Sequence, residues 1–363
     1  MRKQSIIVEA PARICLYGDH QDYLGLPVIT CAIDRYIYLK AEKIDKPHFE
    51  IITPDIEDQR IINLDEEMSS FSEDDHYKSG IFVMKKEGYK IKEGYRISIN
   101  GNIPINAGLS SSSAIIVSWI QFLHAAFGGT NSLSKEELGK LAFQAEVEEH
   151  HAPGGKMDQY AIALGGILFM NMGKNFSYTS LKTDLPSLII GVSGDPKQTN
   201  ETLRRAKNGA LEAIDEIKRH RENFQIRNIQ ENDLVDYLPL VSKGNRNFFK
   251  AAVINHETTK SAHLELQKTH PDFSYLGKIM NRHHHTLQKY LGTTTVRIDS
   301  MVEKVLNAGA YGAKIVGSGG GGCVVALCKE GEEYSIINAF KSGGAQDAYQ
   351  VKPSAGTSVN ILS

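Results

Sequence analysis

The sequence predicts an α+β protein that folds as two domains. The chain has 363 residues, of which 41% are hydrophobic and 23% charged, and this length and composition suit two packed cores rather than one. Strand-like segments rich in β-branched and aromatic residues dominate residues 5–100, whereas helical spacing of apolar residues begins after Ser110. Strands that precede helices along the chain are typical of α+β architecture.

The first half therefore begins with a sheet and continues with helices. The expected strands cover residues 14–17, 28–33, 36–41, 49–53 and 96–99. The first expected helix carries its apolar residues at helical spacing from Ile115 to Leu123. A second covers residues 135–150, and Ser134 with Glu137 three residues later is the pattern of a capping box at its start.

A domain boundary is expected near residue 185, at the turn-like Asp184-Leu185-Pro186. The predicted domains are residues 1–185 and 186–363. Apolar runs at 167–170 and 188–192 flank this turn as strands. The second half is mostly helical, with expected helices at 199–219, 248–267, 275–291 and 300–308 and expected strands at 313–316 and 323–327.

Charge and composition exclude several classes of protein. The formal net charge is -2 and there is no long basic run, so we expect no nucleic-acid partner. The charged N-terminus and the lack of an apolar run of about 18 residues disfavour secretion and membrane spanning. The four cysteines lack metal or redox spacing and are expected to be buried and reduced, which fits a cytoplasmic protein. The expected oligomeric state is a monomer or a homodimer.

A serine-rich loop is the strongest candidate for anion binding. Residues 106–114, Asn-Ala-Gly-Leu-Ser-Ser-Ser-Ser-Ala, lie between an expected strand and a long helix. Backbone N–H groups at a helix N-terminus attract phosphate, and the hydroxyls add donors or metal ligands. The alternative is a plain helix cap, but a cap needs one hydroxyl and this segment has four in a row.

A second glycine-rich segment covers residues 317–322. It contains the G-x-G-x-x-G pattern, but a strand-like run follows it where a dinucleotide site requires a helix. The glycines indicate either a tight turn or close approach to a ligand. The sequence also lacks the P-loop pattern and the protein-kinase signatures, so a phosphate site here is of a third kind.

Two charged groups are candidates for substrate chemistry. Arg13, Asp19, His20 and Asp22 fall along an expected strand and its exit loop, an arrangement that suits a polyol, although turn residues are often merely solvated. Asp158 follows a glycine-marked loop and Lys156, which favours an ionised carboxylate; simple helix capping is the alternative. The adjacent histidines 150–151 and 283–285 lack the spacing of metal ligands and are expected at the surface.

Together these segments resemble the superfamily of galactokinase, homoserine kinase, mevalonate kinase and phosphomevalonate kinase. Three motifs occur in the family's order along essentially the whole chain: residues 11–25, which resemble the galactokinase sugar signature, residues 104–114, and residues 312–323. The resemblance implies a ribosomal protein S5 domain 2-like N-terminal domain and a ferredoxin-like α/β C-terminal domain. This sequence departs from the family's usual residues at Asn106, where glycine is usual, at Asp19, where glutamate is usual, and at residues 193–199.

The resemblance also implies a role for each motif. The nucleotide would contact Asn106, Ala107, Gly108, Leu109, Ser110, Ser111, Ser112, Ser113, Gly319 and Gly320. Ser112 and Glu146 would hold Mg²⁺, which bridges phosphate oxygens. Asp158 would accept a proton from the substrate hydroxyl or orient it, beside Arg13. Asp19, His20 and Asp22, together with Asp158, would bind the sugar.

The implied activity is that of an ATP- and Mg²⁺-dependent sugar kinase acting on the anomeric hydroxyl. A mevalonate kinase or a kinase of sugar phosphates such as heptose phosphate is the alternative within the family, although mevalonate kinases carry lysine at the place of Arg13 and lack the aspartate at the place of Asp22. A regulator that binds sugar and ATP without turnover is the non-enzymatic alternative, and the presence of Asp158, Ser112 and Glu146 favours catalysis.

Overall fold

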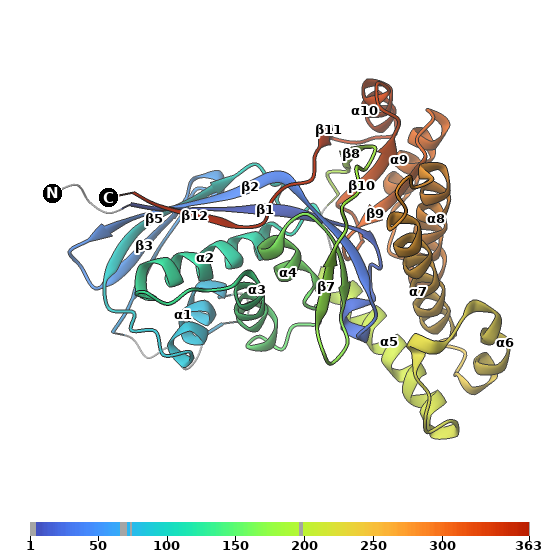
Figure 1. The fold of residues 1–363 in the computed structure, drawn as a ribbon, viewed down its shortest axis with the longest axis horizontal. Coiled ribbons are helices and arrows are strands. Elements are labelled where there is room, and N and C mark those ends of the chain that lie inside the picture. The colour runs from blue at the N-terminus through green and yellow to red at the C-terminus, as the bar shows by residue number, and fades with distance from the viewer. Residues whose placement is uncertain (1–4, 66–70, 73–74, 196–198, 363) are drawn as a thin grey trace.

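The computed structural model describes residues 5–65, 71–72, 75–195 and 199–362, and its strands form two sheets (Figure 1). The first sheet contains β1 (Ser5–Tyr17), β2 (Val28–Ile44), β3 (His48–Thr53), β4 (Asp58–Asn63), β5 (Gly94–Gly101), β6 (Ile167–Asn171), β7 (Ser177–Ser180) and β12 (Ser358–Leu362). The helices beside it are α1 (His76–Lys86), α2 (Ser111–Phe127), α3 (Lys135–Phe143) and α4 (Met157–Leu164).

The second sheet is formed by β8 (Ser187–Val192), β9 (Gly312–Val316), β10 (Cys323–Cys328) and β11 (Asp347–Val351). The helices of this half are α5 (Thr199–His220), α6 (Leu234–Tyr237), α7 (Arg246–Leu266), α8 (Phe273–Thr286), α9 (Val296–Asn307) and α10 (Glu333–Ser342). The first sheet has one parallel pair, the second is entirely antiparallel, and helices occur in both halves, which confirms the α+β prediction.

The long hairpin of β1 and β2 is the centre of the first sheet. The strand order is β12-β1-β2-β5-β3-β4, with β6 pairing with β2 and β7 with β6. All pairs are antiparallel except β3 with β5. The C-terminal strand β12 runs antiparallel to β1, so Ser5 and Leu362 lie side by side at one end of the first sheet (Figure 1).

Helices cover one face of the first sheet, and the other face is open to solvent. Trp119 and Phe122 of α2 are fully buried against Phe49 of β3, with ring centroids 5.4 and 5.9 Å apart. Along β5, the buried Ile97 and Ile99 alternate with the more accessible Arg96, Ser98 and Asn100. This period of two is expected for a sheet that packs on one side only.

The second sheet is buried on both faces. Along β10, Val324 and Ala326 pack in a cluster with α9 and α10, whereas Val325 and Leu327 belong to the large core shared with the first sheet. An uninterrupted apolar strand is what burial on both sides requires. The shared core fixes the two halves against each other.

Most elements expected from the sequence are confirmed. The expected strands lie within β1, β2, β3, β5, β6, β8, β9 and β10, and Ser134 and Glu137 form the capping box that opens α3. The helix expected over 135–150 changes at residue 144 into the π-helical turn Gln144–Glu148. The sequence pattern did not predict α1, α6, α10, β4, β7, β11 and β12.

The boundary near residue 185 remains a proposal. It falls in the segment between β7 and β8, where the chain passes from the first sheet to the second. The final residues cross back, because Pro353 and Ala355 form isolated bridges to Ile33 and Gly165 before β12 pairs with β1. We therefore propose that the first structural unit includes this returning segment.

The surface prediction for the histidine run 283–285 is wrong for His283 and His284, which are 0% and 6% exposed. Helix α8 is covered on more than one side, so neighbouring positions both meet protein. His283 stacks on Tyr17 at the end of β1 with ring centroids 6.4 Å apart, and His284 Nδ1 accepts a hydrogen bond from the backbone N–H of Ile315. His285 is exposed, as expected.

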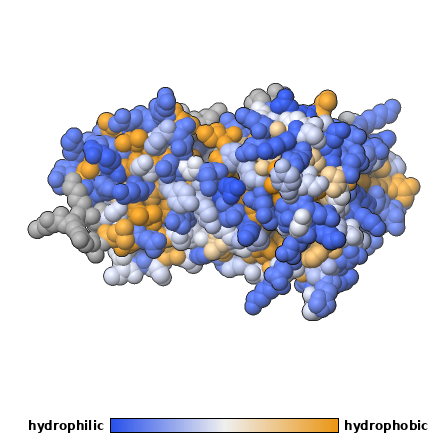
Figure 2. All heavy atoms as spheres, turned by 90° about the horizontal axis from the view of Figure 1, so that it is seen from above, coloured by the Kyte–Doolittle hydropathy of each residue, from blue (hydrophilic) through white to orange (hydrophobic). Residues whose placement is uncertain are grey.

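The four cysteines are buried and free, as expected. Hydrophilic side chains dominate the face shown in Figure 2, and hydrophobic ones lie there in separate small groups. None of the helices within the described ranges has the length and apolar character needed to cross a membrane.

Candidate active site

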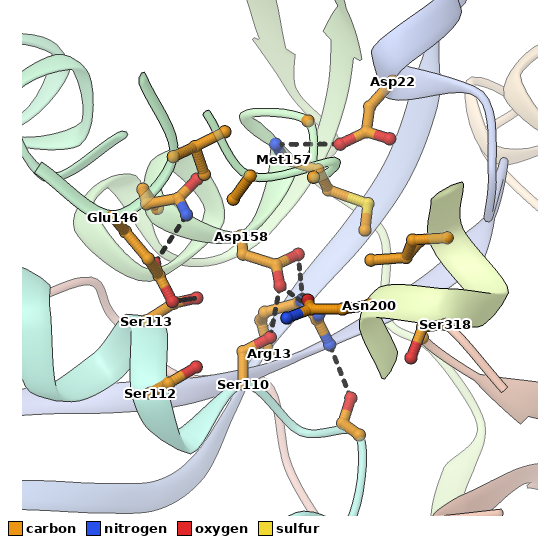
Figure 3. Close-up of a pocket in the computed structure, with 18 of the residues that line it drawn as sticks. Arg13, Asp22, Ser110, Ser112, Ser113, Glu146, Met157, Asp158, Asn200 and Ser318 are labelled. Carbon is orange, nitrogen blue, oxygen red and sulfur yellow. Dashed lines mark hydrogen bonds and ion pairs between the residues drawn. The ribbon is translucent and has the colours of Figure 1, made fainter. Parts of the chain in front are cut away.

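A cavity of about 370 Å³ collects most of the sequence-predicted site residues from both halves of the chain. Leu109, Gly319 and Gly320 are not among the residues that line it, and Leu109 is buried in the core instead. Its wall is formed by the end of β1 and the loop after it, the serine-rich loop, the segment 154–159, the first turn of α5, and Gly317 with Ser318. Figure 3 shows the side chains of Arg13, Asp158, Ser110 and Asn200 converging in this cavity.

Arg13 and Asp158 form a bidentate ion pair at the base of the cavity. Arg13 Nε donates to Asp158 Oδ1 at 2.7 Å, and Nη2 contacts Oδ2. Arg13 Nη1 also donates to the carbonyl oxygen of Gly108 at 2.7 Å. Burial lowers the pKa of Arg13, but Asp158 raises it above its ordinary value. The cation therefore orients the carboxylate and ties it to the serine-rich loop.

Three residues of the serine-rich loop have a left-handed backbone conformation before α2 begins. Asn106 and Ser110 have φ values of 55° and 61°, and Gly108 has a φ of 92°. Asparagine adopts this region more readily than most residues with a side chain, which explains how it replaces the glycine usual at position 106. Ser110 occupies the N-cap position without capping the helix, because its hydroxyl donates to Asp158 Oδ2 at 2.5 Å. The simple capping alternative therefore fails at Ser110.

Glu146 lies on the opposite side of the serine-rich loop and has features of a cation ligand. It projects from the π-helical turn, a distortion often found at functional sites. Its carboxylate accepts hydrogen bonds from Ser113 Oγ at 3.0 Å and Gln159 Nε2 at 2.6 Å. Burial raises its pKa, and the hydrogen bonds from Gln159 and Ser113 act against this. A nearby cation would favour the ionised form.

Oxygen donors suited to Mg²⁺ are therefore present. Ser112 is exposed in the first turn of α2, beside the buried Ser113 and the half-buried Glu146 (Figure 3). No cluster of three or more His, Cys, Asp or Glu side chains arranged for a metal occurs among the described residues. Mg²⁺ bound with phosphates requires only one or two carboxylates, so Glu146 and Ser112 fit that kind of site.

Asp22 lies across the cavity from Glu146, near Asp158. It begins a short 3₁₀ turn after β1, and its Oδ2 accepts a hydrogen bond from the backbone N–H of Met157 at 3.3 Å. Burial and the charge of Asp158 raise the pKa of Asp22 to about 6. Gly155 makes room for this carboxylate, because a Cβ there would lie 2.0 Å from Asp22 Oδ2.

Asp19 and His20 reach the cavity wall, but other protein groups engage their polar atoms. Asp19 is 1% exposed and pairs with Lys314, which lies at the centre of β9. His20 Nε2 donates to the carbonyl oxygen of Ser318 at 3.1 Å, and its Nδ1 lies 3.0 Å from Tyr23 Oη. Both residues thus connect the loop after β1 to the second half of the chain.

The glycine run 317–322 forms the tight turn that was one of its two expected roles. Gly319 and Gly320 have φ values of 82° and 77°, and a Cβ at Gly319 would lie 2.5 Å from the carbonyl oxygen of Thr293. Gly317 and Ser318 line the cavity. Nucleotide contact by Gly319 and Gly320 remains a prediction.

Sequence reasoning missed several residues of this site. Asn200 and Leu203, from the first turns of α5, line the cavity, but nothing in their sequence pattern distinguishes them from other helix residues. Lys314 was detectable, because it is a single charge within the apolar strand Gly-Ala-Lys-Ile-Val. A lone lysine at a position that must be buried calls for a buried anionic partner.

Comparison with known proteins identifies the family. Residues 77–166 match the GHMP kinases N terminal domain, residues 262–346 match GHMP kinases C terminal, and residues 1–43 match the galactokinase galactose-binding signature. The chain is 30% identical to the mevalonate kinase of Thermococcus sibiricus over 349 residues, which cover 93% of each protein. It is 28% identical to the galactokinase of Pyrococcus furiosus over 364 residues, covering 98% of this chain and 99% of the relative.

The fold agrees with this assignment. The crystal structure of Lactococcus lactis galactokinase complexed with galactose matches the chain with a TM-score of 0.85 at 20% identity, covering 98% of this chain and 95% of that one. The expected two-domain kinase fold is therefore confirmed. The chain belongs to the GHMP kinase family of ATP-dependent phosphotransferases that act on hydroxyl groups.

Proposed function

We propose that the protein is a sugar kinase that transfers the γ-phosphoryl group of ATP to the anomeric hydroxyl of a monosaccharide. The observation that carries this proposal is the position of the Arg13–Asp158 pair, between the serine-rich loop and the carboxylate of Asp22. A cavity with a phosphate-binding loop at one side and carboxylates at the other suits an anionic donor and a hydroxyl-rich acceptor.

Asp158 is the proposed base or orienting group. The acceptor oxygen would attack the γ-phosphorus, the bond from this phosphorus to the bridging oxygen would break, ADP would leave, and the hydroxyl proton would pass toward Asp158. Arg13 keeps the carboxylate in place and offers positive charge close to the phosphoryl group. Alignment and charge neutralisation of this kind are the main requirements of a loose transition state.

The serine-rich loop is the proposed phosphate cradle. Backbone N–H groups at the start of α2 point toward the helix N-terminus, where the partial positive charge favours an anion. Ser112 and Glu146 would hold Mg²⁺, which neutralises charge on the phosphate oxygens when bound. Ser113 and Gln159 hold the Glu146 carboxylate in position for this role.

The part of the cavity near Asp22 and Asp158 suits a neutral sugar better than an acceptor that carries a carboxylate or a phosphate. Asp22 and Asp158 place two carboxylates there, and carboxylates accept hydrogen bonds from hydroxyls but repel a carboxylate or phosphate on the acceptor. The match of residues 1–43 to the galactose-binding signature supports the same conclusion. In the proposal, Asp22 binds a hydroxyl remote from the reacting one, whereas both ring nitrogens of His20 are engaged by Tyr23 and Ser318.

Mevalonate is the second candidate acceptor. The specific observation in its favour is the 30% identity to the mevalonate kinase of Thermococcus sibiricus over nearly the full length of both proteins. The carboxylate of Asp22 argues against it, because mevalonate carries a negative charge at neutral pH.

The experiment that decides is ADP release with Mg-ATP across hexoses, pentoses, uronic acids, heptose phosphates and mevalonate, followed by phosphorus NMR of the product. A sugar 1-phosphate supports the proposal, whereas turnover of mevalonate alone makes the second candidate correct. A matched reaction with excess EDTA tests the metal, and full turnover without Mg²⁺ would remove it from the mechanism.

A further inference from the structure

Asp19 and Lys314 form an ion pair that is almost completely buried between the two halves of the chain. Asp19 is the second residue after the end of β1, and Lys314 is the third residue of β9. Their side chains are 1% and 0% exposed, and Lys314 Nζ lies 2.7 Å from Asp19 Oδ2. Lys314 Nζ also donates to the carbonyl oxygen of Cys15 in β1 at 2.9 Å. The lysine therefore binds both the end of β1 and the loop after it.

The other oxygen of Asp19 holds the glycine run. The backbone N–H of Gly317, its first residue, donates to Asp19 Oδ1 at 2.9 Å. The contact from His20 Nε2 to the carbonyl oxygen of Ser318 lies next to it. Two consecutive residues of the loop after β1 thus hold two consecutive residues at the start of the glycine run.

The pair is charged despite its burial. Burial by itself would raise the pKa of Asp19, but Lys314 lowers that pKa below its ordinary value. His283 Nε2 lies 3.9 Å from Asp19 Oδ2, and burial, with the charge of Lys314, lowers the pKa of His283 to about 3. The Asp19 carboxylate thus lies beside Lys314 and a neutral imidazole.

This arrangement leaves the Asp19 carboxylate without a free side for an acceptor hydroxyl. One oxygen faces Lys314 and the other accepts from Gly317, and only 1% of the side chain reaches the surface. Asp22, three residues later, is by contrast half-buried and faces the segment that carries Asp158. The two aspartates of one loop therefore have different surroundings.

We propose that Asp19 is a positioning residue, which together with Lys314 locks the acceptor loop (residues 19–22) to the glycine run 317–322 and does not itself bind the acceptor. The inference rests on the proposed function in one respect, because it takes the glycine run as a part of the nucleotide site. A buried charge that loses its partner is strongly unfavourable. Removal of either member should therefore displace both loops together.

The test measures binding of Mg-AMP-PNP to the full chain by isothermal titration calorimetry, without any acceptor. Asp19→Asn and Lys314→Met are each expected to weaken this binding by about tenfold or more, the scale of coupling between residues in contact. The double variant is expected to bind Mg-AMP-PNP about as weakly as the single variants do, because both substitutions break the same contact.

A residue that only bound the acceptor would leave nucleotide affinity unchanged. Unaltered AMP-PNP binding in Asp19→Asn would thus overturn the inference. So would a double variant whose fold-loss of AMP-PNP affinity equals the product of the losses in the two single variants. If a single variant fails to fold, the double variant remains informative, because it contains no unpaired buried charge. Wild-type affinity in the double variant would equally overturn the inference.

Tyr17→Phe is the matched control for loss of a contact between the halves. Tyr17 is 2% exposed, and its hydroxyl donates to the carbonyl oxygen of Leu276 in α8 at 2.9 Å. Phenylalanine removes this one contact between the halves and leaves the Asp19–Lys314 and Asp19–Gly317 contacts in place. We expect this variant to lower the thermal midpoint and to keep AMP-PNP affinity. If Asp19→Asn behaves in the same way, the pair is merely structural. Failure of the wild-type chain to bind AMP-PNP would overturn the proposed function, and this inference with it.

Discussion

Asp158 receives hydrogen bonds from two segments that are distant in the sequence. Arg13 reaches it from β1 and Ser110 from the start of α2, and Asp158 itself is the second residue of α4. Such a carboxylate has little freedom to rotate, so its position relative to an acceptor hydroxyl is set before the substrate arrives. Preorganisation of this kind is a large part of what an enzyme contributes to phosphoryl transfer.

Replacement of Asp158 by asparagine should lower kcat by about 10²–10⁴-fold, the usual contribution of a positioned base. The amide keeps the size of the side chain but cannot accept the proton or balance the charge of Arg13. Mg-AMP-PNP affinity is expected to stay within a few-fold, since the phosphates bind at the loop. ADP-release kinetics and calorimetry check the two halves of this prediction, and retained turnover would remove Asp158 from the chemistry.

Asp22 should make stability depend on pH in an identifiable way. Its pKa in the folded protein is raised to about 6, so the folded state holds this proton more tightly than the unfolded state does. The stabilisation is complete below the ordinary aspartate pKa of about 4 and is lost as the pH rises through about 6. An ionised Asp22 therefore costs stability at neutral pH.

Asp22→Asn should raise the thermal midpoint relative to the wild type at about pH 7–8, and the difference should shrink as the pH falls from about 6 toward 4. Thermal unfolding of both proteins over this range is the measurement. A difference that does not change with pH would show that Asp22 titrates normally. The same variant should raise KM for the acceptor, because the amide also has two donor hydrogens where the hydroxyls need an acceptor.

At the scale of elements, short distortions place the functional side chains. A π-helical turn after α3 presents Glu146, left-handed residues shape the serine-rich loop, and a glycine pair precedes α4. These two adjacent glycines have different surroundings. A Cβ at Gly155 would collide with the carboxylate of Asp22, whereas a Cβ at Gly154 would meet only Val147 Cγ2, at 3.8 Å.

Gly155→Ala should therefore displace Asp22 and raise the KM for the acceptor by about tenfold or more, as expected when a charged hydrogen bond of 1.5–3 kcal/mol is lost. Gly154→Ala is the control, with an expected change much smaller than this. Steady-state kinetics at saturating ATP compare the two variants. Equal effects would show that the segment tolerates no side chain at all, for reasons unrelated to Asp22.

At the scale of the whole molecule, the C-terminal strand joins the end of the chain to its beginning. β12 pairs with β1 over five residues, from Ser5 with Leu362 to Glu9 with Ser358. Gly165 and Gly356 approach so closely that a Cβ at Gly165 would lie 1.8 Å from the backbone nitrogen of Gly356. The second half of the chain therefore contributes an edge strand to the sheet of the first.

Deletion of residues 354–363 should lower the thermal midpoint by at least about 5 °C, given a shift of about 2–4 °C per kcal/mol for domains of this size. It should also promote aggregation, because β1 becomes an exposed edge. Ile361→Ser with Leu362→Ser is the control, since these side chains are half exposed and the backbone pairing remains. Differential scanning calorimetry and light scattering measure both effects; an unchanged midpoint after deletion would contradict the prediction.

The sequence by itself determined the fold class, the family and the candidate residues of the cavity. Apolar period and turn residues are local signals, so they located most strands and helices, the capping box at Ser134 and the serine-rich loop before α2. Motifs preserved in order located Arg13, Asp22, Glu146 and Asp158, all of which line one cavity in the structure.

Only the tertiary structure decided which of these residues face the cavity and which hold it together. Asp19 and Asp22 look alike in the sequence, yet one is buried against Lys314, which lies 295 positions further along the chain, and the other is left half-buried near Asp158. His283 and His284 were expected at the surface but are buried, because α8 is covered by β9 and by the end of β1. Burial and pairing depend on contacts between distant segments, and a local sequence pattern carries no information about which segments will meet.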